Sequence, residues 1–312
     1  MTDHPERRML LDTAALYFRA FYAVPDSVRA PNGMPVNAVR GLLDIIARLA
    51  SEFQPTEIVA CWDDDWRPQW RVDLIPTYKT HRVAEVGDEV PPIEKVPDLL
   101  TPQVAVIREV LGALGVPVIG APHHEADDVI GTLASHSAIP VDVVTGDRDL
   151  FQVIDDSREV RAIYTGRGMS RLEVLTDAAL EAKYGVIPAQ YADFAAMRGD
   201  ASDGLPGVAG VGEKTAVTLL STYGNLDGIV AAAADPASGM APPVRAKILA
   251  ATDYLAVAPA VVKVVRDLEL PEFDARIRAR TREQTAELDR LSADWGLGSS
   301  MERARDALGA LA

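Results

Sequence analysis

Apolar and polar positions in the first half of the chain alternate between two periodicities. Four short apolar runs have the length expected of buried strands: 9–12, 57–62, 116–119 and 141–144. Four longer segments repeat their apolar residues at helical spacing: 16–22, 36–53, 104–114 and 127–135. This alternation predicts an α/β fold, with a mainly parallel sheet flanked by helices on both faces.

Two changes in this pattern divide the chain further. Residues 66–102 have little periodicity and are rich in proline and charge, and a connection this long in a compact domain is usually functional or disordered. After about residue 176 the sequence becomes helical and rich in alanine and glycine, with closing helices expected at 283–295 and 301–311. We therefore expect a sheet domain over residues 1–175 and a smaller helical region over 176–312.

Composition places the chain among ordinary globular proteins. It has 312 residues, of which 48% are apolar and 25% charged, so it can bury a sizeable core. No apolar run is long enough to span a bilayer, and the N-terminal sequence lacks an apolar signal core, so we expect no membrane partner and a cytoplasmic location. The single Cys61 excludes an intramolecular disulfide framework.

Acidic residues gather where the predicted apolar elements begin or end. Asp12 and Asp63 each end or follow a predicted strand, and Gly146-Asp147-Arg148-Asp149 follows the strand at 141–144. The carboxyl ends of parallel strands are where α/β sheets place their ligands. Glu125-Ala126-Asp127-Asp128 opens a predicted helix, and its outer acids share the i, i+3 spacing of two further acids, Asp200 and Asp203.

This density of acids indicates a site for hard cations. Like charges repel one another unless a divalent ion lies between them, and no histidine or cysteine pattern indicates zinc. Two ions about 4 Å apart suit phosphodiester hydrolysis. Any one of these acids alone is more often a helix cap, but the convergence of five segments favours a Mg²⁺ or Mn²⁺ site.

A glycine-rich turn at residues 204–216 leads into a helix predicted at 217–223. Gly207, Gly210 and Gly212 free the backbone to turn tightly and to bring N–H groups toward a phosphate. Lys214 and the helix N-terminus add positive potential, and the spacing differs from that of a Walker loop. The turn fits a helix–hairpin–helix grip on a DNA backbone, and a plain helix–turn–helix corner is the alternative.

The irregular segment at 66–102 combines cations with aromatic residues. Cations bind phosphates and aromatic rings stack on bases. The residues concerned are Arg67, Trp70, Arg71, Tyr78, Lys79 and Arg82. A solvated linker is the alternative, and the acids of the same segment partly support it. The net charge of −15 is a global sum, whereas phosphate binding depends on where the basic residues lie.

These residues belong to a series of motifs that spans almost the whole chain. In chain order they are Leu11-Asp12, Trp62-Asp63, Trp70-Arg71, Tyr78-Lys79-Thr80-His81-Arg82, Glu125–Gly131, Gly146–Leu150, Gly199–Val208 and Gly210–Ala216. The series resembles the bacterial 5′ nucleases of the flap endonuclease family, the type found as the N-terminal domain of DNA polymerase I. The resemblance implies a PIN-like α/β fold, a helical arch over the active site at about 66–102, and a helix–three-turn–helix at about 199–224.

The resemblance also implies roles for individual residues. One group of acids would hold the first metal site directly or through water: Asp12, Asp63, Glu125, Asp127, Asp128 and Asp147. A second group would build the other site: Asp149, Asp200 and Asp203, with Asp147 shared. Lys79 and Arg82 match arch positions that contact the scissile phosphate or guide the 5′ strand, so we expect Lys79, Arg82 and Asp147 to be catalytic. The expected DNA contacts are Arg67, Arg71, Tyr78, Lys79, Arg82, Gly207, Gly210, Gly212, Lys214 and Thr215, with a potassium ion at the helix–three-turn–helix.

We therefore predict a structure-specific 5′ nuclease, both 5′-flap endonuclease and 5′-3′ exonuclease, that acts by two-metal-ion catalysis in replication and repair. Its expected substrates are 5′-flap, nicked or 5′-ended duplexes and the RNA of RNA–DNA hybrids, and we expect a stand-alone monomer. A PIN-type ribonuclease, which does not need the grip at 207–214, and a non-catalytic DNA-binding protein are the alternatives. Residues 83–96 are longer and more acidic than the family pattern, which leaves the shape of the arch open.

Overall fold

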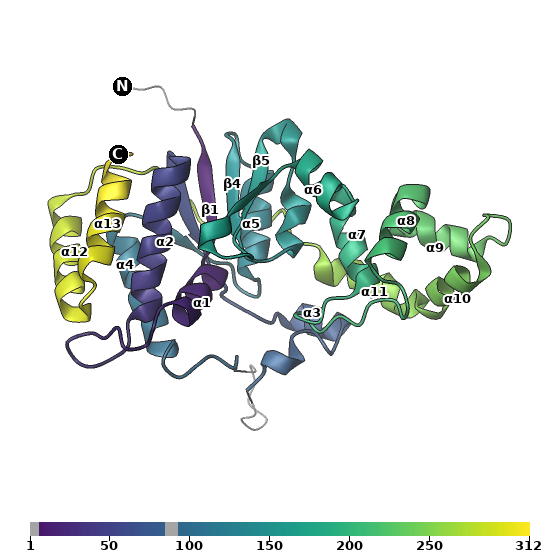
Figure 1. The fold of residues 1–312 in the computed structure, drawn as a ribbon, viewed down its shortest axis with the longest axis horizontal. Helices are drawn as coiled ribbons and strands as arrows, with labels where there is room; N and C mark the ends of the chain where they lie inside the picture. The colour runs from purple at the N-terminus through teal and green to yellow at the C-terminus, as the bar shows by residue number, and fades with distance from the viewer. Residues whose placement is uncertain (1–5, 85–92) are drawn as a thin grey trace.

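A computed structural model describes residues 6–84 and 93–312 of the chain. Its sheet has six strands, β1 (Arg8–Asp12), β2 (Glu57–Cys61), β3 (Val118–Ile119), β4 (Val141–Thr145), β5 (Val160–Tyr164) and β6 (Glu173–Leu175). The strand order is β3-β2-β1-β4-β5-β6, and Figure 1 shows β1, β4 and β5 side by side. The first five strands are parallel and β6 is antiparallel to β5, which confirms the predicted fold class.

The register of the strands aligns the carboxyl ends of β1, β2 and β4, which the predicted acids end or follow. Leu11 of β1 pairs with Ala60 of β2 on one side and with Val144 of β4 on the other. Leu10 and Leu11 are both fully buried but belong to different apolar clusters, because successive side chains point to opposite faces of the sheet. A strand buried on both faces is typical of a parallel sheet covered by helices.

Helices cover both faces of the sheet. One face carries α1 (Thr13–Ala23), α2 (Asn37–Phe53) and α4 (Thr101–Ala113), and the other carries α5 (Ala126–Ser135). These four helices confirm the predicted ones. The structure adds β5 and β6, for which the sequence pattern gave no expectation, because each is short and Arg161 interrupts the apolar run of β5.

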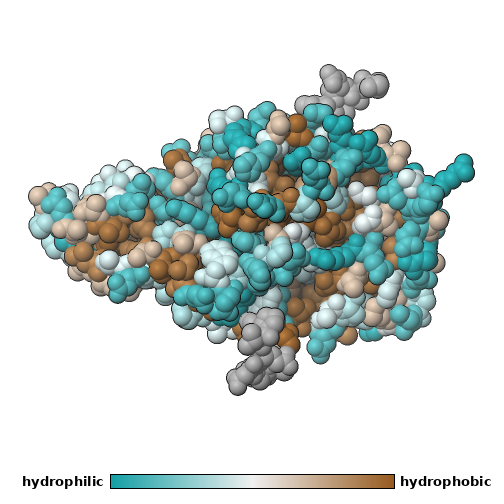
Figure 2. All heavy atoms as spheres, turned by 180° about the vertical axis from the view of Figure 1, so that it is seen from behind, coloured by the Kyte–Doolittle hydropathy of each residue, from teal (hydrophilic) through white to brown (hydrophobic). Residues whose placement is uncertain are grey.

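Six helices form the region that extends to one side of the sheet (Figure 1). They are α6 (Asp177–Tyr184), α7 (Pro188–Arg198), α8 (Glu213–Tyr223), α9 (Leu226–Ala234), α10 (Pro242–Ala250) and α11 (Thr252–Val262). Phe151, Tyr191 and Phe194 pack in the core that joins this region to the sheet domain. Seen from behind, the molecule tapers toward these helices, with apolar and polar side chains interspersed (Figure 2).

The last part of the chain returns to the sheet domain. Residues 263–281 run back in extended form, and the N–H of Ile58 donates to the carbonyl of Ala275 at 2.9 Å. The closing helices α12 (Arg282–Trp295) and α13 (Gly298–Gly309) then pack beside α2 and α4 (Figure 1). The division of the chain at about residue 175 stays a proposal, and in this packing residues 282–309 lie with the sheet domain.

The segment predicted as an arch is partly described. It contains α3 (Gln69–Leu74) and a short 3₁₀ turn at Thr80–Arg82, followed by an isolated pairing of Val83 with Glu94. Residues 85–92, within the insert at 83–96, lie outside the described part of the chain. No helix in the ranges 6–84 and 93–312 has the length and apolar character needed to cross a membrane.

Candidate active site

A cavity of about 450 Å³ opens beside the carboxyl ends of β1, β2 and β4. Six acids from separate segments line it: Asp12, Asp63, Glu94, Asp127, Asp147 and Asp200. Four cations line it as well: Arg19, Lys79, Arg82 and Arg148. The strand register and the sequence motifs thus bring most of the predicted acids to one place.

Local hydrogen bonds fix the acids that follow the strands. Asp12 caps α1, because its Oδ1 accepts from the N–H of Ala15 at 3.2 Å, and its Oδ2 accepts from the Thr145 hydroxyl at 2.7 Å. Asp63 Oδ1 accepts from the N–H of Ala126 at 2.8 Å, at the first turn of α5. Helix capping and cavity lining therefore coincide in the same carboxylates.

Burial and mutual repulsion make these acids costly to ionise. Burial raises the pKa of Asp12 to about 7, and the charges of Asp63 and Asp147 act in the same direction. Burial also raises the pKa of Asp127 well above its ordinary value, reinforced by Asp12 and Asp147. A bound cation would relieve both effects, because it replaces lost hydration and screens the repulsion.

The second group of acids contains an unsatisfied oxygen. The Oδ1 atom of Asp149 is buried and has no hydrogen-bond partner, and burial together with the charges of Asp147 and Asp203 raises the pKa of Asp149. Burial likewise raises the pKa of Asp203 to about 6, although Lys79 opposes this effect. A buried carboxylate oxygen without a donor, next to two more acids, has the chemistry of a ligand for a hard cation.

The carboxylates of these acids are not arranged around a common point as the ligands of a bound metal ion would be. In the described ranges of the chain, no three or more acidic, histidine or cysteine side chains are arranged so that they could hold a metal ion. Several of these carboxylates accept hydrogen bonds from neighbouring donors. Ser202, for example, donates from its N–H to Asp200 Oδ1 at 2.8 Å, and Arg198 donates to Asp200 Oδ2 at 3.1 Å. The donor set fits divalent ions, and side-chain rotations would be needed to close around them.

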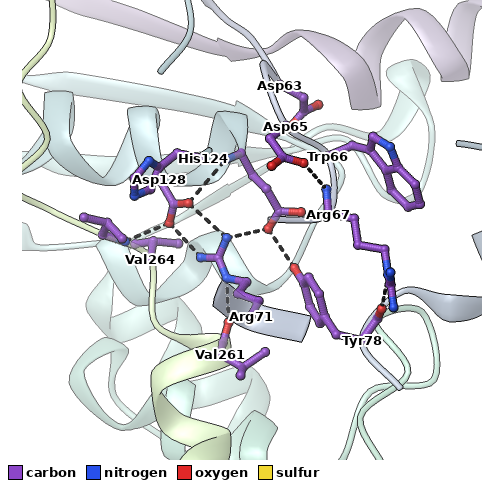
Figure 3. A network of polar contacts seen from close by, with 12 residues as sticks. Asp63, Asp65, Trp66, Arg67, Arg71, Tyr78, His124, Asp128, Val261 and Val264 are labelled. Carbon is purple, nitrogen blue, oxygen red and sulfur yellow. Dashed lines mark hydrogen bonds and ion pairs between the residues drawn. The ribbon is translucent and has the colours of Figure 1, made fainter. Parts of the chain in front are cut away.

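Two acids predicted as ligands, Glu125 and Asp128, lie in a buried ion network. Arg71 bridges Asp128 and Glu125: its Nη2 lies 2.7 Å from Asp128 Oδ1, and its Nη1 lies 2.6 Å from Glu125 Oε2 (Figure 3). Asp128 also accepts from the N–H of Val265 at 2.9 Å and does not line the cavity. We therefore leave Asp128 out of the proposed first metal site, because it faces Arg71 and lies outside the cavity that Asp12, Asp63, Asp127 and Asp147 line.

The same network corrects two expected DNA contacts. Arg71 and Tyr78 are each only 2% exposed, so neither reaches the surface. Tyr78 donates from its hydroxyl to Glu125 Oε2 at 2.7 Å, and Arg71 also donates from Nε to the Val261 carbonyl at 3.1 Å (Figure 3). Both side chains support the site from within, because burial and these partners leave them unavailable to DNA.

Lys79 and Arg82 do reach the cavity, as the motif suggests. Lys79 contacts Glu125 Oε1. Burial alone would lower the pKa of Lys79, but the Glu125 carboxylate raises it well above its ordinary value, so the amine is charged. Arg82 donates from Nη2 to the Ser202 carbonyl at 2.9 Å and lies 3.4 Å from Asp203 Oδ1. Both cations are thus paired with predicted metal ligands or their loop.

Several residues of the cavity wall were missed by sequence reasoning. They include Phe18, Arg19, Trp66, Glu94, Arg148 and Tyr164. The sequence does contain a signal that Arg19 lies near the site. Arg19 and Ala15 are spaced i, i+4 and so share one face of α1, the helix that Asp12 caps. Arg148 lies between the two acids of its own motif and could have been noted there.

The glycines of the turn at residues 204–216 allow close backbone contacts. At Gly207, where φ is +68°, an added Cβ would lie 2.5 Å from the backbone nitrogen of Gly199. This glycine therefore allows two backbone segments to approach each other. The Gly210 carbonyl accepts from Lys247 Nζ at 2.8 Å. Gly210, Gly212 and Lys214 are exposed and Thr215 is half-buried, so the turn is open to a ligand where it leads into α8.

Family models match both parts of the chain. The 5′-3′ exonuclease N-terminal resolvase-like domain matches residues 7–185, and the 5′-3′ exonuclease C-terminal SAM fold matches residues 186–285. The chain belongs to the 5′-3′ exonuclease family. This confirms the family expected from the motifs.

Two relatives carry the name of this family, and solved structures share the fold. A 5′-3′ exonuclease of Streptomyces coelicolor is 55% identical over 295 residues, which cover 95% of this chain and 98% of that protein. A 5′-3′ exonuclease of Mycobacterium tuberculosis is 48% identical, covering 97% and 98%. In fold, the chain is similar to a bacteriophage T5 flap endonuclease solved as a pseudo-enzyme-product complex with DNA and metal ions. The TM-score is 0.61 at 14% identity, with 98% and 99% of the two chains covered.

Proposed function

We propose that this member of the 5′-3′ exonuclease family is a metal-dependent 5′ nuclease that hydrolyses phosphodiesters of DNA. One observation carries the proposal: Asp12, Asp63, Asp127 and Asp147 line the same cavity as Lys79 and Arg82. Acids that fit divalent cations thus face cations that fit a phosphate. The names of the two relatives at 55% and 48% identity support the same activity.

Two sets of residues would hold two or more Mg²⁺ or Mn²⁺ ions. The first is Asp12, Asp63, Asp127 and Asp147, with Glu125 once Lys79 releases it. The second is Asp149, Asp200 and Asp203, with Asp147 shared. Divalent ions bound there supply Lewis-acid stabilisation of the charge that develops on the phosphate, and they lower the pKa of water.

The protein's own cations would position the scissile phosphate. Lys79 and Arg82 enter the cavity from the turn at Thr80–Arg82 and its preceding residue, and each is paired with an acid or with the loop at 200–204. Because the acids would turn toward the divalent ions, these cations would be freed for the phosphate oxygens. Both cations would then position the scissile phosphate and neutralise part of its negative charge.

Duplex DNA would be held at the start of α8. The exposed Gly212 and Lys214, with Thr215, combine backbone N–H groups, a helix N-terminus and a positive charge. We propose that Gly207 and Gly210 contribute by shaping the turn, and that a potassium ion binds at its carbonyls. Arg67, Arg71 and Tyr78 are not included among the proposed contacts.

We propose 5′-flap, nicked and 5′-ended duplexes as substrates, with RNA of RNA–DNA hybrids as a further one. The fold shared with a flap endonuclease bound to DNA supports the flap substrate, and the relatives' names support action from a 5′ end. The proposal also includes a monomer that acts in the cytoplasm during replication and repair.

Substitution at the shared acid tests this function. Asp147→Asn and Asp149→Asn should each abolish cleavage of a 5′-labelled flap duplex in Mn²⁺ while the proteins keep wild-type thermal stability or exceed it. Asp44→Asn, which removes an exposed acid on α2 paired with Arg303, serves as the control and should cleave normally. Undiminished cleavage by Asp147→Asn would refute the assignment, and cleavage of RNA with no action on DNA would favour a PIN-type ribonuclease.

A further inference from the structure

The turn that carries Lys79 is held by an arginine that the sequence assigns to DNA binding. Arg67 donates from Nε to the Tyr78 carbonyl at 2.6 Å (Figure 3). Its Nη2 donates to the Pro76 carbonyl and to the Thr80 hydroxyl, each at 3.2 Å. The guanidinium thus spans the turn from residue 76 to residue 80.

Lys79 needs this support because its backbone is in the left-handed region. Its φ is +49° and its ψ is +20°, a conformation that non-glycine residues adopt only when their surroundings enforce it. The peptide between Tyr78 and Lys79 is fixed at both ends. Its carbonyl accepts from Arg67, and its N–H donates to the Asp203 carbonyl at 2.9 Å.

The orientation of this peptide decides where the lysine amine lies. Lys79 lines the cavity, and its Nζ, at the end of a four-carbon side chain, contacts the buried Glu125. A small rotation of the peptide would therefore displace Nζ by more than it moves the backbone. Arg67 itself does not line the cavity, and its Nε and Nη2 are committed to protein acceptors.

We propose that Arg67 is a positioning residue for the nuclease reaction, which orients Lys79 toward the scissile phosphate and makes no contact with DNA. The inference rests on the proposed function, because Lys79 can act only if the cavity is the reaction site. It replaces the sequence-based assignment of Arg67 as a phosphate contact.

A double-mutant cycle tests the proposal. Wild type, Arg67→Met, Lys79→Met and the double variant are compared in single-turnover cleavage of a 5′-labelled flap duplex in Mg²⁺, with duplex affinity measured separately in EDTA. Arg67→Met should lower the cleavage rate about tenfold while affinity stays within about twofold. In the Lys79→Met background, the Arg67 substitution should change the rate by less than about twofold, because its effect passes through the lysine.

Two results would overturn the inference. The first is a loss in Arg67→Met that multiplies fully with that of Lys79→Met. The second is weaker duplex affinity with a reduced salt dependence, which would make Arg67 a phosphate contact. Wild-type cleavage by Lys79→Met would instead refute the proposed role of Lys79, and this inference with it.

Controls separate positioning from general damage. Arg48→Met removes a half-exposed arginine on α2 that pairs with Glu52, and should leave rate and affinity unchanged. If Arg67→Met does not fold, Arg67→Lys and Thr80→Val give the same test, because each removes part of the bridge across the turn. Both should lower the rate less than Arg67→Met at unchanged affinity, and wild-type rates in both would count against the proposal.

Discussion

Arg71 and Asp128 form a two-pronged ion pair inside the protein, with Nη2 2.7 Å from Oδ1 and Nη1 2.9 Å from Oδ2. Both side chains are almost fully buried. The pair joins α3, which precedes the turn that carries Lys79, to the first turn of α5. It therefore links the basic segment to α5. In this helix Asp127, the neighbour of Asp128, lines the cavity.

Removing Arg71 should destabilise the whole protein. Arg71→Met removes the ion-pair partner of the buried Asp128, while Glu125 keeps Lys79 and Tyr78, and the unpaired carboxylate costs about 3–5 kcal/mol of unfolding free energy. Asp128→Asn in the same background should restore part of this loss. The measurement is urea denaturation, with Arg303→Met as the control: Arg303 also donates two hydrogen bonds to an aspartate, both to Asp44 Oδ1, but this pair is about half exposed, so its loss should cost about 0–1 kcal/mol. Equal costs for the two substitutions would contradict this view of the network.

Stability without metal should fall as pH rises from about 4 to about 7. Burial raises the pKa of Asp12 to about 7 and that of Asp203 to about 6, above the ordinary value of 3.8. In this window the folded state holds protons that the unfolded state has released, so deprotonation works against folding. Melting temperatures measured in EDTA across this range should therefore decline, and Asp12→Asn should flatten the decline.

Divalent ions should reverse this dependence. Because protons and cations compete for the same carboxylates, the stabilisation by Mg²⁺ should increase as pH rises through 6 and 7. The check is a melting curve with and without Mg²⁺ at each pH. A Mg²⁺ effect that is constant over this window would contradict the assignment of Asp12 and Asp203 as ligands.

Gly204 should be irreplaceable at the contact between the two loops. Its φ is +71°, and an added Cβ would lie 2.2 Å from the Thr77 carbonyl oxygen. Gly204→Ala should therefore cost about 1–3 kcal/mol in stability and lower cleavage, because the loop at 200–204 would move away from the turn at 76–80. Gly112→Ala is the matched control: an added Cβ meets nothing within 4 Å, and this helical position should be stabilised by about 0.5–1 kcal/mol.

Lys214 should contribute affinity for duplex DNA without sequence preference. Lys214→Ala should weaken binding of all duplexes to a similar extent and reduce the salt dependence of log K by about 1, because one phosphate contact is lost. Lys263→Ala, an exposed lysine just after α11, is the comparison and should bind as wild type. Equal effects of the two substitutions would remove α8 from the proposed duplex grip.

The sequence identified the parallel sheet and the acids at its strand ends because both depend on local pattern. A buried strand that ends in an acid places that acid at a defined edge, so Asp12, Asp63 and Asp147 were found from spacing alone. The family followed from motifs that are local as well, and the family models confirm it. The capping alternative was also correct for Asp12, since one carboxylate serves both purposes.

Tertiary structure alone decided which of two neighbouring acids faces the cavity and which faces a cation. Asp127 and Asp128 are adjacent in one motif, yet the first lines the cavity and the second pairs with Arg71, 57 residues away in the chain. It also decided that Arg67 supports the turn of Lys79, and that α12 and α13 return to the sheet domain. The physical reason is that a charged side chain takes its role from the partners that packing brings to it, and the separation of those partners along the chain leaves no periodic trace in the sequence.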